Sequence, residues 1–62
     1  MDYVKELEVH QETASSVVLA RVNGMYVVSY HSMYRNSARV FKKYETAFRI
    51  YNSWVRDYTL VP

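Results

Sequence analysis

The sequence predicts an α+β fold, in which an antiparallel β-hairpin or three-stranded sheet carries one C-terminal amphipathic helix packed on one face. Two observations support it. Asn23 and Gly24 separate two apolar runs, which is the strongest short-range sign of a hairpin. From Lys43 to Tyr58, apolar residues recur every three or four positions, which is the spacing of an amphipathic helix.

The hairpin is predicted to pair strands at about residues 15–22 and 25–32. A two-residue type I′ turn needs positive φ at both central positions, and Asn followed by Gly tolerates this best. The turn sets the register, so that Arg21 faces Tyr26. Both faces are then apolar, whereas a half-exposed sheet would alternate apolar and polar residues. One face has the smaller Val18, Ala20, Val22, Met25 and Val27, and the other has Val17, Leu19, Tyr26, Val28 and Tyr30.

Residues 3–11 are predicted to form the third strand, with a helix as the alternative because the face containing Val4, Glu6, Glu8 and His10 is largely acidic. Tyr3, Lys5, Leu7 and Val9 would share the other face.

The C-terminal helix carries a favourable i, i+4 pair, Glu45 and Arg49, on its polar side. Residues 38–41 fit either a short strand or the first turn of this helix, with Asn36 or Ser37 as its cap. Residues 59–62 are expected to form an extended tail.

The length of 62 residues indicates a single small domain, residues 1–62. A chain this short buries only about 60 % of the surface that its unfolded form exposes. It contains no cysteine for disulfides, which leaves association as the expected source of extra stability. No segment reads as a signal peptide or membrane span, so we expect a soluble, cytoplasmic protein. A short chain beginning at Met without a targeting signal is also typical of phages and mobile elements.

Enzymatic chemistry is not expected, because nucleophile elbows, phosphate loops and zinc motifs are absent. The neighbouring carboxylates Glu6 and Glu8 lie on an expected solvated strand face. His10 and His31 are too few to provide the three or four ligands of a zinc site. We therefore predict no enzyme, no metal and no cofactor.

A protein-binding surface is the first functional hypothesis. Tyrosine is enriched at interface centres because it buries a large area while its hydroxyl still finds a partner. The sequence leaves open which hairpin face the helix covers. The hypothesis takes the face with Tyr26 and Tyr30 as the one that the helix does not reach, with Tyr34 beyond it. The predicted binding residues, for a protein partner or a second copy of the chain, are Arg21, Tyr26, Val28, Tyr30 and Tyr34.

Nucleic-acid binding is the alternative hypothesis. Residues 1–12 carry four acids against one lysine, a net charge of −3, whereas residues 13–62 carry seven bases against two acids, a net charge of +5. Basic residues interleaved with rings suit phosphate contacts and base stacking. The predicted contacts are Arg35, Arg39, Lys42 and Lys43, beside Tyr34, Phe41 and Tyr44.

Overall fold

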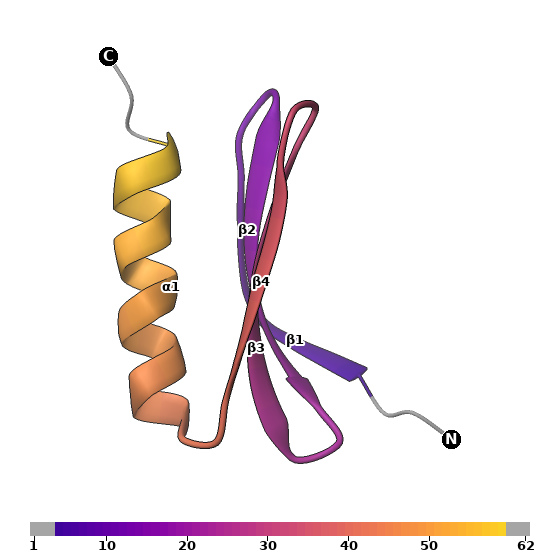
Figure 1. The fold of residues 1–62 in the computed structure, drawn as a ribbon, viewed down its shortest axis with the longest axis vertical. Helices are drawn as coiled ribbons and strands as arrows, with labels where there is room; N and C mark the ends of the chain where they lie inside the picture. The colour runs from indigo at the N-terminus through magenta and orange to yellow at the C-terminus, as the bar shows by residue number, and fades with distance from the viewer. Residues whose placement is uncertain (1–3, 60–62) are drawn as a thin grey trace.

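A computed structural model of the chain describes residues 4–59, with side chains described as far as Asp57. Four strands form one antiparallel sheet in chain order, and a single helix lies against one face of it (Figure 1). The predicted α+β architecture is confirmed, with one strand more than the hairpin or three-stranded sheet expected. The elements are β1 (Val4–Gln11), β2 (Ser15–Val22), β3 (Met25–Ser32), β4 (Asn36–Phe41) and α1 (Tyr44–Thr59).

The central hairpin has the predicted strands and the predicted register. Asn23 has a φ of 51° and Gly24 a φ of 82°, as a type I′ turn requires at its two central residues. Val22 therefore pairs with Met25 and Arg21 with Tyr26, and the alternation continues to the far end of both strands.

The first segment is a strand, but a β-bulge changes its predicted faces. The pairing with β2 passes from Glu6 directly to Glu8, which leaves Leu7 as the extra residue, packed against the core. After the bulge, Glu8 lies opposite Leu19 and Val9 lies opposite Val18. The prediction that Val9 shares a face with Lys5 and Leu7 is therefore wrong, and Val9 points away from the helix. Tyr3, the predicted start of this strand, lies outside the described residues.

Residues 36–41 form β4, which pairs along β3 rather than beginning the helix. The turn before β4 is closed by Ser32, whose hydroxyl accepts the backbone N–H of Arg35 at 3.0 Å and of Tyr34 at 3.3 Å. Asn36 is thus a strand residue and not a helix cap. The helix begins one residue after the predicted start and extends through Thr59, the first residue of the expected tail; residues 60–62 of that tail lie outside the described residues.

The core lies between α1 and the hairpin face with the larger side chains. Val28 is fully buried and Tyr30 is 9 % exposed, so the helix covers the face that the binding hypothesis had taken as uncovered. Large side chains such as Leu19 and Tyr30 fill the space beneath a helix, and burying each such side chain contributes about 1.5–3 kcal/mol. The buried cluster consists of Val17, Leu19, Val28, Tyr30, Ala47 and Tyr51.

Candidate protein-binding surface

The sheet has a second face, turned away from α1, which no other described element covers (Figure 1). The strand register arranges its side chains in rows across the sheet. One row runs Val4, Val22, Met25; the next runs Glu6, Ala20, Val27, Val40; and the third runs Val9, Val18, Ser29, Ala38. We call these three rows the open face.

The open face is a continuous apolar surface. Its edge valines are the most accessible, with Val4 61 %, Val40 59 % and Val9 50 % exposed. Towards the middle, Val27 is half-buried by its neighbours, and Ala20 is only 8 % exposed. Four strands at a spacing of about 4.8 Å and five residues along β2 give a flat area of roughly 300 Å². This is comparable with the largest apolar patch on a typical monomeric protein, which is often functional.

Polar residues bound the open face at one end. The fourth row across the sheet contains Gln11, Ser16, His31 and Asn36. There the Nδ1 of His31 lies 3.4 Å from the Oδ1 of Asn36. Within the three apolar rows, the only charged side chain is Glu6.

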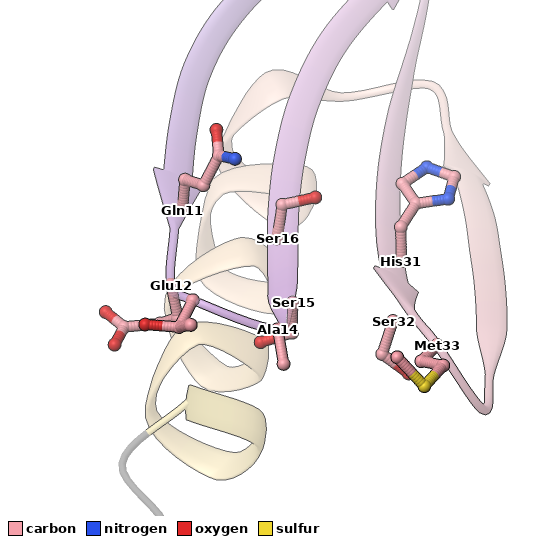
Figure 2. Close-up of a pocket in the computed structure, with 9 residues that line it drawn as sticks. Gln11, Glu12, Ala14, Ser15, Ser16, His31, Ser32 and Met33 are labelled. Carbon is pink, nitrogen blue, oxygen red and sulfur yellow. The ribbon is translucent and has the colours of Figure 1, made fainter.

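Beyond this polar row, the turns at the end of the sheet enclose an open hollow of about 560 Å³ (Figure 2). Gln11 and His31 contribute to its lining from the sheet, and Glu12 and Met33 from the turns. On the helix side of β1, Glu12 Oε2 lies 2.9 Å from His10 Nε2, the distance of an ion pair, although the two atoms lack the angles of a hydrogen bond. Among residues 4–59, no three potential metal ligands gather into one site.

The five residues predicted to bind a protein do not form one surface. Val28 and Tyr30 lie in the core, and Tyr26 is half-buried on the same side of the sheet. Arg21 is exposed beside Tyr26, whereas Tyr34 is 93 % exposed in the turn after β3. Tyr26 lies near the start of β3 and Tyr34 lies beyond its end, so the remaining length of the strand, about 20 Å, separates the two levels. The two hairpin faces are similarly apolar, and the difference in side-chain size between them, visible in the sequence, was the signal that could have placed the helix.

Tyr26 begins a series of aromatic contacts that continues along α1. Its ring meets the edge of Tyr44 with centroids 5.6 Å apart, and Tyr44 stacks on Phe48 at 5.6 Å. Phe48 in turn stacks on Tyr51 at 6.3 Å. Burial, reinforced by the negative charge of Glu8, raises the pKa of Tyr51 above its usual value. The Tyr26–Tyr44 contact joins the sheet to the helix, and the other two contacts run along α1.

The four predicted nucleic-acid contacts are exposed, but they extend along β4 and its flanks rather than gathering in one patch. Arg35 precedes the strand and Lys42 follows it, so about 23 Å of extended chain lies between them. Arg39 lies on the helix side of the sheet, where its guanidinium carbon is 5.7 Å from the centroid of the Phe41 ring.

Comparison with known proteins assigns no family to the chain: no family model matches it, and no significant match was found among curated proteins or among solved structures. Among the described residues, no helix has both the length and the apolar character needed to cross a membrane.

Proposed function

We propose that this protein is a non-enzymatic, cytoplasmic protein-binding module, of the kind that acts as a small inhibitor or regulator. The observation that carries the proposal is the open face, which presents a continuous apolar surface although the chain has its core on the other side of the sheet. An apolar patch of this extent is a common mark of an interaction site.

The energy available to a partner supports the proposal. Complete burial of a valine side chain contributes about 1.5–3 kcal/mol. Since Val4, Val9 and Val40 are each at least half exposed, a partner that covers them gains roughly 1 kcal/mol from each. The rest of the face adds to this without requiring the partner to desolvate many charges, because Glu6 is the only one in the apolar rows.

A paired variant tests the proposal. Val27→Glu places a charge at the centre of the open face, and Asn52→Glu makes the same charge change on the exposed side of α1. The tagged protein and both variants are used to recover partners from a lysate of the native cell or its host, divided into nuclease-treated and untreated halves. A partner that survives nuclease and moderate salt, and is lost only with Val27→Glu, supports the proposal. Recovery that Val27→Glu leaves unchanged contradicts it.

Binding of nucleic acid is a second candidate, favoured by the position of the Arg39 guanidinium over the Phe41 ring. A cation beside a ring suits the backbone and the bases of a single strand. Replacing both Lys42 and Lys43 with Glu should abolish such binding and leave the open face intact. Binding that does not weaken as salt is raised would exclude this candidate.

A further inference from the structure

We propose that the open face binds a second copy of this chain, so that two sheets stack face to face about a twofold axis parallel to the strands. The inference rests on the proposed function, since it names the occupant of the same surface. In the resulting dimer, the two open faces form an inner apolar layer and the two helices lie on the outside.

The short length and the lack of cysteine make a second apolar layer favourable for stability. A chain of 62 residues without cysteine has few internal means of stabilisation. Its buried cluster is confined to one side of the sheet, around Leu19 and Val28. Stacked sheets pack about 10 Å apart through side chains that interdigitate, and valine and alanine are well suited to that layer. The second copy provides a matching apolar face.

The sheet edges favour stacking over strand addition. On β1, the bulge at Leu7 disturbs the regular ladder, and Lys5 and Glu6 place charges along the strand. The other edge strand, β4, is short and carries Arg39. Bulges, charges and short edge strands are the usual protection against edge-to-edge pairing. The open face has no such protection beyond Glu6.

Charge selects the orientation of the two copies. The β1 edge is acidic, with Glu6, Glu8 and Glu12 against Lys5, whereas the β4 edge and its flanks contain only bases. A twofold axis perpendicular to the strands would place β1 over the partner's β1 and bring like charges together. An axis parallel to the strands places β1 over the partner's β4, which brings the acidic edge of each copy next to the basic edge of the other, although Glu8 and Arg39 lie on the helix side of each sheet. The basic residues of that edge are Arg35, Arg39, Lys42 and Lys43.

The same axis also matches positions along the strands. Gln11 and Asn36 lie in one row, so Glu12, just after β1, and Arg35, just before β4, are at the same end of the sheet. Rotation about an axis parallel to the strands keeps each row at its level, so that Glu12 of one copy and Arg35 of the other lie at the same end of the dimer. Val9 likewise comes to lie over Ala38 of the second copy.

The area is sufficient for a reversible dimer. Including the polar row at the end, the face measures roughly 19 Å by 24 Å. Two such faces would together bury on the order of 1,000 Å², which is at the low end of specific interfaces. We therefore expect association in the micromolar range rather than a permanent dimer.

Sedimentation equilibrium on the full chain, from about 1 to 500 µM, tests whether a second copy of the chain occupies the open face. We expect a concentration-dependent dimer, at least tenfold weaker in Val27→Glu and unchanged in Asn52→Glu. Circular dichroism of the variants shows whether each one remains folded, and Val40→Lys provides a second disruption at an exposed position if Val27→Glu does not fold. A monomer throughout the range, or a dimer that neither open-face variant weakens, overturns the proposal.

Crosslinking tests the orientation, because the chain has no cysteine of its own. Val9→Cys and Ala38→Cys are prepared separately and treated with a short bismaleimide that spans the distance between stacked sheets. With the axis parallel to the strands, the mixture crosslinks strongly and each variant alone does not. Efficient crosslinking of Val9→Cys with itself would place β1 over β1 and overturn the orientation. A monomeric chain that still recovers a foreign partner through Val27 would refute self-association alone and leave the proposed function standing.

Discussion

The two faces of one sheet have nearly the same apolar character, yet only one of them is covered. The covered face carries Leu19 and Tyr30 among its buried side chains, whereas the open face, apart from Glu6 and Ser29, is built from valine, alanine and one methionine. The covered face is reinforced by the ring contacts from Tyr26 along α1. The open face has shorter side chains, and polar residues bound it at one end.

The difference shows that side-chain size, and not only apolar character, decides which face receives a helix. A helix presents a curved surface with a stripe of large residues, here including Tyr51 and Trp54. Long side chains from the sheet fill the space beside such a stripe, whereas small ones would leave voids with lost contacts. A layer of short valine and alanine side chains suits close packing against another sheet.

Truncation in the core should have the largest effect. Leu19→Ala removes a fully buried side chain and should lower the free energy of unfolding by about 2–5 kcal/mol. The total for a chain of this length is roughly 3–9 kcal/mol, so the variant should be largely unfolded at moderate urea. Val9→Ala, on the open face, is the control and should cost less than about 1 kcal/mol at low protein concentration. Equal losses for the two variants would refute the distinction between the faces.

A substitution in the turn that fixes the register should cause the next largest loss of stability. Gly24 has positive φ, and an added Cβ would meet no atom within 4 Å, so Gly24→Ala tests the backbone cost alone. We expect a loss of about 1–2 kcal/mol in urea unfolding. Asn23→Asp keeps a residue that tolerates the left-handed region and should change stability much less. A shift of one residue in this hairpin would exchange its two faces. An unchanged unfolding midpoint for Gly24→Ala would show that the turn does not constrain the register.

Alkaline pH should weaken the covered face. The folded protein raises the pKa of Tyr51. The stability that this tyrosine contributes is therefore fully present below its pKa in the unfolded chain, about 10, and is lost as the pH rises through its higher pKa in the folded protein. Denaturant unfolding at successive pH values above 9 should show this loss, and Tyr51→Phe should remove it. Glu8→Gln should make the loss smaller, since it removes the charge that opposes ionisation. A pH dependence that is identical in Tyr51→Phe would contradict the assignment.

The smallest effect on folding should come from an exposed position of the open face. Val40→Thr keeps the β-branched shape but adds a hydroxyl, and the free energy of unfolding at about 1 µM should change by less than about 0.5 kcal/mol. At the concentrations where we propose that the chain dimerises, the same variant should weaken association several-fold by sedimentation. If unfolding at low concentration were as sensitive as association, the open face would belong to the core of the monomer.

The sequence by itself determined the parts of the fold that depend on neighbours in the chain. The turn at Asn23 and Gly24 set both the strands and the register of the hairpin, because its φ angles are a local property. The spacing of Ala47 and Tyr51 located the helix to within one residue at its start, because a helix closes its hydrogen bonds within four residues.

Only the tertiary structure decided the remaining features. It paired residues 36–41 with β3, inserted Leu7 as a bulge, and placed α1 over Val28 and Tyr30 rather than over Val27. The candidate site changed faces for that last reason, although the sequence had indicated that one apolar face would stay open. Each of these choices depends on how segments distant in the chain fill space against one another. Apolar periodicity records which side chains avoid water, but it does not record which surface will cover them.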